Sequence, residues 1–391
     1  MFSQRTNWKL SPNRFTLALG TIRASGAQLA DLSVSNPTEC GLQYDAPAIL
    51  SAFQNSNALV YDPQPKGLLS AREEVVRYYV SDHRISLDPE SIVLTTSTSE
   101  AYSFVFSLLC NAQDEVLVPK PSYPLFDFLA ELQDVALIPY SLEYAHGWLV
   151  DFQSVMRALS PRTRAILLVH PNNPTGSYLR AEEVRQLNKL CWERNLALIV
   201  DEVFLDYSFA SASPKTFAAN QDALTFTLSG LSKIAALPQM KVAWVATTGP
   251  ASLVRAAIDR LEVIADTYLS LNAPTQWALP ALFEQRRSLQ PQLLRRIREN
   301  RANLKKLLSS PPGCEFLDAD GGWYAVLHVP TQRSDEDLVI DLLEKHRVIV
   351  HPGHFYDFPK DGFLVVSLIT PREIFEEGIS RLLSHLKETE G

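Results

Sequence analysis

The sequence lacks a surplus of positive charge, closely spaced cysteines and long apolar runs, and each absence excludes a class of protein. Its 391 residues carry a formal net charge of -8, so the composition does not support nucleic-acid binding. The four cysteines lie far apart with no C-x-x-C pair, which argues against a metal site or disulfide framework and fits a reducing compartment. No apolar run approaches the length of a membrane span. We therefore expect a cytoplasmic protein without a membrane, nucleic-acid or metal partner.

The chain shows no internal repeat and no low-complexity linker, and its length predicts two domains. Short apolar runs alternate with amphipathic segments through the first two thirds of the chain, which is typical of a mainly parallel sheet covered by helices on both faces. Seven strands are predicted, at residues 92–95, 115–118, 135–138, 165–169, 196–200, 224–228 and 242–246.

The remaining segments predict helices and a second, smaller α/β unit. Residues 1–30 read as an arm or a short helix. Helices are predicted at 253–263, 275–284 and 290–308. The last third then alternates strands (323–328, 348–350 and 363–367) with helices (336–346 and 372–387).

Polar residues follow several of the predicted strands, where open α/β sheets bind their ligands. Thr95-Thr-Ser-Thr-Ser99 precedes a helix, and helix N-terminal N–H groups and hydroxyls suit a phosphate as well as an ordinary cap. Tyr123 follows the next strand, where it stacks on a planar ring or packs in the core. A rigid turn with two side-chain amides, His170-Pro-Asn-Asn-Pro-Thr-Gly176, follows a third strand.

Two charged residues complete this series of strand ends. Asp201 ends an apolar strand, where a carboxylate is costly unless it pairs with a cation such as a protonated ring nitrogen. Lys233 follows Ser229-Gly-Leu-Ser232, and a lysine held in a pocket can lose its proton and attack a carbonyl carbon. Each residue alone has an ordinary explanation, and a solvated surface lysine is the commonest. Their occurrence in order at successive strand ends favours one shared cofactor site.

With these residues in place, the chain resembles the class I/II aminotransferases of fold type I, the pyridoxal-phosphate enzymes of the aspartate aminotransferase superfamily. The resemblance covers nearly the whole chain and rests on Asn172-Asn-Pro-Thr-Gly176, Asp201-Glu-Val203, Ser232-Lys233 and Ser270-Leu-Asn-Ala-Pro-Thr-Gln276, with support from Gly321-Gly322 and Pro352-Gly353. It implies a large domain at residues 46–284 with a seven-stranded, mainly parallel sheet. A small α/β domain from residues 1–45 plus 285–391 and a homodimer with shared active sites are also implied.

The resemblance also implies a role for each strand-end residue around pyridoxal 5'-phosphate. Lys233 is expected to be the covalent anchor and the acid/base, and Asp201 to pair with the ring nitrogen so that the ring withdraws electrons. Asn173 is expected to bond the 3-oxygen, and Tyr123 to stack on the ring. The expected phosphate contacts are Ser97, Thr98, Ser229, Ser232, Lys241 and, toward the neighbouring subunit, Tyr61.

Five positions depart from the common family pattern. Gly230 stands in place of a phosphate-binding serine, and Lys241 in place of an arginine, which keeps the charge but loses the bidentate fork. Phe204 replaces a tyrosine that donates to the 3-oxygen, and Ser35 replaces a glycine near the substrate carboxylate. Val365 stands where the arginine that clamps this carboxylate is expected.

The position of Val365 follows from two landmarks, Ser367 and Glu376-Glu377. The alternative is a local slip in this alignment, with Arg372 or another arginine as the clamp. His351, beside the Pro352-Gly353 turn, is a further candidate for binding an anion or an ordinary surface histidine.

We therefore expect an aminotransferase that moves an amino group between an amino acid or amine and a keto acid, with an atypical substrate-carboxylate site. A lyase, decarboxylase or synthase on the same fold is the alternative, because it shares the chemistry up to the carbanion. A non-catalytic regulator is a third hypothesis. The short segment before Asp31 and the intact Lys233 and Asp201 argue against it.

Overall fold

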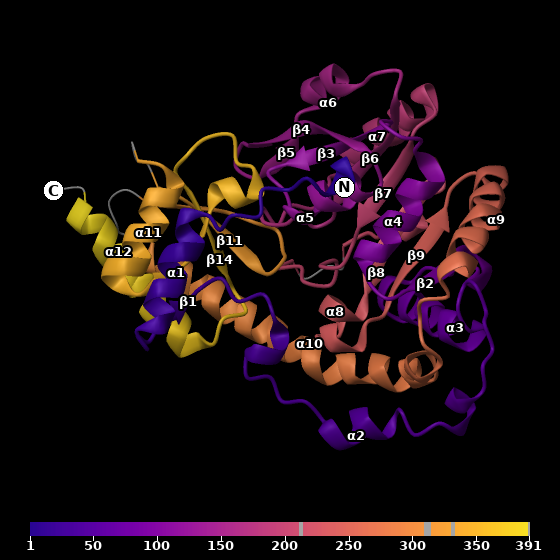
Figure 1. The fold of residues 1–391 in the computed structure, drawn as a ribbon, viewed down its shortest axis with the longest axis horizontal. Coiled ribbons are helices and arrows are strands. Elements are labelled where there is room, and N and C mark those ends of the chain that lie inside the picture. The colour runs from indigo at the N-terminus through magenta and orange to yellow at the C-terminus, as the bar shows by residue number, and fades with distance from the viewer. Residues whose placement is uncertain (211–213, 309–313, 330–332, 390–391) are drawn as a thin grey trace.

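The computed structural model describes residues 1–210, 214–308, 314–329 and 333–389, which form two α/β units (Figure 1). The larger unit is built on an eight-stranded sheet. In spatial order its strands are β2 (Ile92–Thr95), β9 (Ala243–Thr248), β8 (Thr225–Gly230), β7 (Ala197–Asp201), β6 (Thr163–Val169), β3 (Glu115–Lys120), β4 (Ala136–Tyr144) and β5 (Trp148–Val150). β9 is antiparallel to both neighbours and β5 to β4, and the other pairs are parallel.

The sheet has eight strands where the sequence predicts seven. The additional strand, β5, has three residues and closes a hairpin on β4, with Leu142 opposite Val150. A strand this short has too few alternating residues to be recognised from periodicity. The prediction of a mainly parallel sheet is confirmed.

Helices cover both faces of this sheet, as the continuous apolar strands predict. Alternate residues of β6 point to opposite faces, so Leu167 belongs to one apolar cluster and Ile166 to the other. The first cluster includes side chains of α4 (Thr98–Leu109), α5 (Leu125–Leu132) and α9 (Ala251–Tyr268). The second includes α6 (Phe152–Ala158) and α7 (Ala181–Arg194), while α3 (Leu69–Tyr78) joins a third cluster that extends into the smaller unit.

The smaller unit combines both ends of the chain. β1 (Ala30–Asp31) pairs in parallel with β12 (Val348–Ile349). An antiparallel sheet has the order β10 (Glu315–Leu317), β11 (Tyr324–His328), β14 (Phe363–Ser367) and β13 (His351–Pro352). The unit's helices are α1 (Arg14–Ala24), α11 (Asp335–His346) and α12 (Arg372–Thr389), and Figure 1 shows them together at one end of the molecule.

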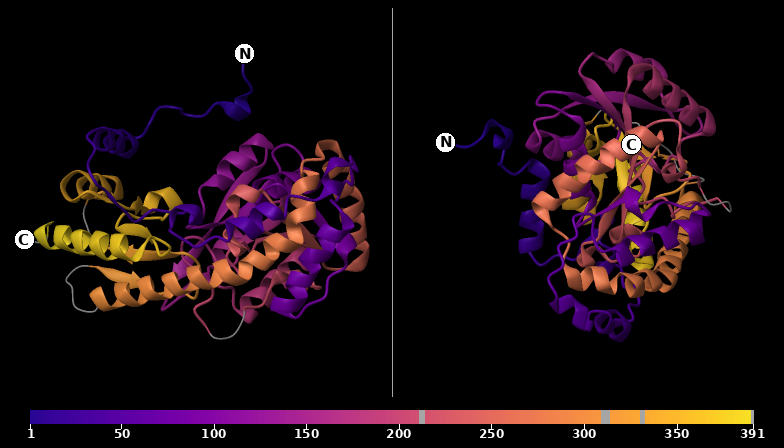
Figure 2. Two further views of the ribbon diagram at one scale, coloured as in Figure 1. Left: turned by 90° about the horizontal axis from the view of Figure 1, so that it is seen from below. Right: turned by 90° about the vertical axis from the view of Figure 1, so that its right-hand side faces the viewer.

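One long helix, α10 (Ala273–Leu307), joins the two units and runs along the molecule in Figure 2. The prediction of two separate helices, 275–284 and 290–308, was wrong, because the intervening residues continue the helix. Arg286 and Leu289 in this stretch are buried. Pro291 lies inside α10 rather than ending it, and it is exposed, between the buried residues Leu289 and Leu293. The predicted boundary near residue 284 therefore falls within a helix.

Among the described residues, no helix combines the length and apolar character needed to cross a bilayer.

Candidate active site

A cavity of about 150 Å³ lies where the predicted strand ends converge. Its walls come from several elements and include Ser35, Thr98, Ser99, Tyr123, Phe126, Val169, Asn173, Asp201, Val203, Phe204, Gly230, Ser232, Lys233, Ala243 and Tyr324. The carboxyl ends of β6, β7 and β8 supply Asn173, Asp201 and Lys233. The tertiary structure thus brings together the central residues singled out in the sequence.

Asp201, the last residue of β7, presents a buried carboxylate to this cavity. The side chain accepts hydrogen bonds from the Tyr102 hydroxyl at 2.9 Å and from the Val203 main-chain N–H at 3.0 Å. Burial raises the pKa of Asp201, while these two hydrogen bonds and the charge of Lys233 act in the opposite direction. A cationic group in the cavity would favour the charged carboxylate further.

Lys233 lies on the one-turn helix α8 (Leu231–Ile234) and points into the same cavity. Its Nζ lies 3.5 Å from the main-chain oxygen of Ser35 and 4.9 Å from the ring centroid of Trp323. Burial lowers the pKa of Lys233 to about 8, although Asp201 and Cys40 act to raise it. A substantial fraction of this amine is therefore neutral, and nucleophilic, near neutral pH.

Several buried polar atoms at this end of the sheet have no hydrogen-bond partner among the described residues. They include Oδ1 of Asn173, which is 7% exposed, and Oγ of Ser229, which is 2% exposed. Leaving such atoms unpaired costs about 1–3 kcal/mol each. Asn173 lines the cavity, so a polar ligand there would supply the missing partner of its oxygen, whereas Ser229 is not among the lining residues.

The first turn of α4 supplies the hydroxyl side of the cavity. Thr98 and Ser99 line it, with the helix N-terminus behind them. Ser97 does not line the cavity, because its Oγ caps α4 by accepting from the Glu100 main-chain N–H at 3.2 Å. Ser232, across the cavity on α8, does line it.

Lys241 and Tyr61, like Ser97 and Ser229, are predicted phosphate contacts that are not among the described residues lining the cavity. Lys241 is exposed and has a left-handed backbone at φ 54°. Tyr61 is 82% exposed and lines a separate hollow of about 360 Å³ beside residues 269–274. Their proximity to any phosphate stays a prediction.

The cavity wall beside Ser35 has a neutral, aromatic lining. Ser35 and Phe204 line the cavity together with Tyr324. Val365 is 1% exposed in the middle of β14, opposite Val326 of β11 and His351 of β13. No arginine is among the described lining residues, and their only lysine is Lys233.

The alternative clamps named from the sequence do not reach this region. Arg372 lies at the start of α12 and bonds Glu376 at 2.8 Å on the exposed face of that helix. His351 is not among the lining residues, and its Nδ1 lies 3.0 Å from the Tyr356 hydroxyl. Burial lowers the pKa of His351, which favours the neutral imidazole.

Sequence reasoning missed Tyr102 and Tyr324. Tyr102 follows Thr98 by one helical turn, and we read its segment only as an amphipathic helix. Tyr324 follows Gly321-Gly322 in a predicted strand, and nothing in this local pattern indicates that its side chain reaches the cavity. Their proximity to Asp201 and Ser35 results from contacts between residues at least 99 positions apart.

Comparison with known proteins agrees with this geometry. Residues 28–382 match the family described as aminotransferase class I and II. The chain is 27% identical over 375 residues to glutamate-pyruvate aminotransferase AlaA of Haemophilus influenzae, covering 94% of this chain and 93% of that protein. It is also 27% identical to alanine aminotransferase of Mycobacterium tuberculosis, with coverages of 90% and 84%.

The fold matches solved structures of the same kind. The alanine aminotransferase from Pyrococcus furiosus superposes with a TM-score of 0.87 at 23% identity, over 99% of this chain and 100% of that one. A lyase, decarboxylase or synthase is not favoured by these relatives. The family match spans both α/β units and the whole cavity, so the chain belongs to the class I and II aminotransferases and is a transaminase of fold type I.

Proposed function

We propose that the cavity binds pyridoxal 5'-phosphate and that the enzyme transfers an amino group between an amino acid or amine and a keto acid. The observation that carries this proposal is the meeting of Lys233, Asp201 and Asn173 in one cavity, with the side-chain oxygen of Asn173 unpartnered among the described residues. A buried carboxylate, an amide and a partly neutral lysine match the ring nitrogen, ring oxygen and aldehyde of this cofactor. The residues therefore fit the group.

Each side chain then has a defined task. Asp201 would hold a protonated ring nitrogen, with Tyr102 fixing the carboxylate by its 2.9 Å hydrogen bond. Asn173 would bond the ring oxygen, and Tyr123 would cover the ring face. Thr98, Ser99 and Ser232 would receive the phosphate at the N-terminus of α4.

Bound pyridoxal phosphate supplies an aldehyde carbon and an electron-withdrawing ring, and the chain supplies proton transfer. The Lys233 Nζ would hold the group as the neutral amine, which its lowered pKa of about 8 makes available. The same amine would serve as the acid and base for the proton at the donor carbon. The rings of Trp323 and Phe204, whose centroids lie 4.9 and 5.8 Å from Nζ, limit the access of water to it.

Among the described residues that line the cavity there is no arginine to clamp a substrate carboxylate. Burying a carboxylate without a cation is costly. We propose that the donor either lacks a carboxylate beside its amino group or has it bound by neutral groups such as Tyr324 and Ser35. The names of the relatives point to alanine, glutamate and pyruvate as the first substrates to test.

We also propose a cytoplasmic homodimer in which Tyr61 serves the neighbouring active site. Four free cysteines support a reducing compartment. The exposed run Leu59, Val60 and Tyr61, which is 90%, 62% and 82% exposed, supports an interface at this edge.

A single-turnover screen tests the function. Purified enzyme loaded with pyridoxal phosphate is mixed with amino acids and amines, and cofactor absorbance and product are followed. Stoichiometric pyridoxamine phosphate with a keto acid or aldehyde supports transamination, while release of ammonia or carbon dioxide without it contradicts the proposal. Rapid conversion by low concentrations of glutamate or aspartate would contradict the neutral carboxylate site. Borohydride should fix the cofactor to Lys233, and Lys233→Ala should abolish both fixation and turnover.

A further inference from the structure

The one-turn helix that carries Lys233 is held by side chains from outside it. α8 has four residues, too few for a helix to be stable by its own hydrogen bonds. Three side chains donate to main-chain oxygens of this turn and the residues after it. The Tyr207 hydroxyl bonds Lys233 O at 2.5 Å, Gln290 Nε2 bonds Ile234 O at 3.1 Å, and the Tyr44 hydroxyl bonds Ala236 O at 2.8 Å.

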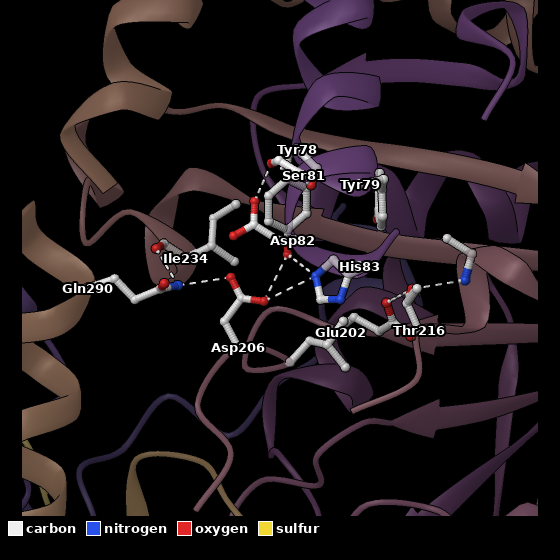
Figure 3. A network of polar contacts seen from close by, with 12 residues as sticks. Tyr78, Tyr79, Ser81, Asp82, His83, Glu202, Asp206, Thr216, Ile234 and Gln290 are labelled. Atoms are coloured by element: carbon white, nitrogen blue, oxygen red, sulfur yellow. Dashed lines mark hydrogen bonds and ion pairs between the residues drawn. The ribbon is translucent and has the colours of Figure 1, made fainter. Parts of the chain in front are cut away.

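Gln290 has a second partner, because its Nε2 also donates to Oδ2 of Asp206 at 2.8 Å. Figure 3 shows the Gln290 amide between the Asp206 carboxylate and the Ile234 carbonyl. With an acceptor on each side, the two hydrogens of this amide have fixed directions. Asp206 thus orients the group that holds the lysine turn.

Asp206 is fixed in turn by a buried network. Its Oδ1 accepts from the Tyr78 hydroxyl at 3.1 Å and lies 3.2 Å from His83 Nε2, while Arg286 approaches Oδ2 at 3.3 Å (Figure 3 shows the Tyr78 and His83 contacts). Burial raises the pKa of Asp206, but His83 and Arg286 outweigh this effect and the pKa lies below its usual value. The carboxylate therefore stays charged and remains an acceptor for Gln290.

We propose that Gln290 and Tyr207 are positioning residues that fix the main chain of the lysine turn and thereby hold the Lys233 amine in its partly buried position against Trp323. Gln290 belongs to α10, directly before Pro291, on the helix that joins the two units. Tyr207 belongs to the turn after β7, which also carries Asp201. Lysine and carboxylate are thus held in one mutual arrangement. This inference rests on the proposed role of Lys233.

The experiment compares Gln290→Met and Tyr207→Phe with wild type. Methionine keeps the length of the side chain without a donor, and phenylalanine removes only a hydroxyl. Gln186→Met is the matched control, because Gln186 is exposed on α7 and donates to Glu182 Oε1 of the same helix at 2.8 Å. In cofactor-free protein, the acylation rate of Lys233 by acetic anhydride is measured against pH by peptide mass spectrometry. Exposed Lys189 serves as the internal reference.

A loosened turn lets water reach the amine, so the pH midpoint of Lys233 acylation should rise in both variants toward that of Lys189. A rise of about one pH unit from about 8 lowers the neutral fraction at pH 7.5 by about eightfold. The loaded enzyme should show a matching fall in kcat with little change in KM, and Gln186→Met should behave as wild type.

Failure of the proposed function and failure of the positioning role give different results. If borohydride does not fix pyridoxal phosphate to Lys233 of the wild type, the proposed function fails and the positioning role fails with it. If the wild type is labelled but both variants keep its acylation midpoint, the positioning role alone is wrong. Loss of folded structure in either variant, judged by circular dichroism and thermal unfolding, would also overturn it, since the effect would then be on the whole fold.

Discussion

Gly230 lies so close to Val242 that no side chain fits between them. A Cβ on Gly230 would lie 2.8 Å from the main-chain oxygen of Val242 and 2.9 Å from the Ala243 Cβ. Gly230 ends β8 opposite Ala243, the first residue of β9. The serine expected from the family resemblance at this position is therefore excluded by the packing of β9. This leaves Ser232 and the start of α4 as the hydroxyl groups beside the lysine.

Restoring that serine should destabilise the protein. We expect Gly230→Ser to lower the free energy of unfolding by about 1–3 kcal/mol, because backbone atoms rather than flexible side chains must move. Urea unfolding measures the change. Gly20→Ala is the control, since it lies in α1 with nothing within 4 Å of the new Cβ, and should be neutral or stabilising. Equal stability of Gly230→Ser and wild type would show that the backbone of β9 can move away from a side chain at position 230 at little cost in free energy.

Phe204→Tyr should lower the pH midpoint of the cofactor absorbance in the loaded enzyme. The Phe204 ring lines the cavity and its centroid lies 5.8 Å from the Lys233 Nζ, so a new phenol would bring a hydrogen-bond donor to the proposed cofactor site. A hydrogen bond from this phenol would stabilise the deprotonated form of the bound cofactor. We therefore expect the pH midpoint of the absorbance change to fall by about one unit. A spectral titration measures it, with Phe209→Tyr as the control. If the bound cofactor of the wild type is already deprotonated well below neutral pH, the expectation that Phe204 leaves its pH midpoint high is wrong.

Glu202→Gln should reduce the pH dependence of stability between about pH 4.5 and 7. Burial raises the pKa of Glu202 to about 7 from its usual 4.5, although Thr216, Phe217 and His83 act to lower it. The folded state then keeps a proton that the unfolded chain releases, so this contribution to stability is lost as pH rises through that window. The size of the loss is roughly 3 kcal/mol at most.

Unfolding of wild type and Glu202→Gln at pH 5 and pH 8 measures this difference. The informative quantity is the change of the unfolding free energy with pH. The absolute stability is not, because glutamine also changes the hydrogen bonds from the Thr216 hydroxyl and the Phe217 N–H, each 2.6 Å long. Exposed Glu193→Gln is the control and should keep the wild-type slope. An unchanged slope in Glu202→Gln would show that Glu202 is ionised in the folded protein across this range.

Mixed dimers should test whether Tyr61 acts across a subunit interface. Tyr61→Ala alone should weaken cofactor retention, and Lys233→Ala alone should be inactive. In a mixed dimer of the two, one site combines Lys233 of the first subunit with Tyr61 of the other. We expect this mixture to regain up to half the activity of a wild-type dimer. No gain on mixing, with subunit exchange verified by mass spectrometry, would contradict a shared site.

The central residues of the candidate site could be predicted because each follows a strand whose apolar run is visible in the sequence. Asn173, Asp201 and Lys233 needed only the rule that parallel strands present their carboxyl ends to one edge. The hydroxyl of Ser97 could not be assigned in this way. A serine before a helix serves equally as a cap or as a ligand, and only its 3.2 Å bond from Glu100 decided for the cap.

Most strands and helices and the strand-end residues were determined by the sequence itself, because periodicity and turn chemistry act over a few neighbouring residues. Only the tertiary structure decided that α10 continues through Pro291, that Tyr102 supports Asp201, and that Gln290 holds the turn of Lys233. These relationships join residues far apart in the chain. They depend on side-chain directions that are fixed only when the core packs and its buried polar groups must find partners.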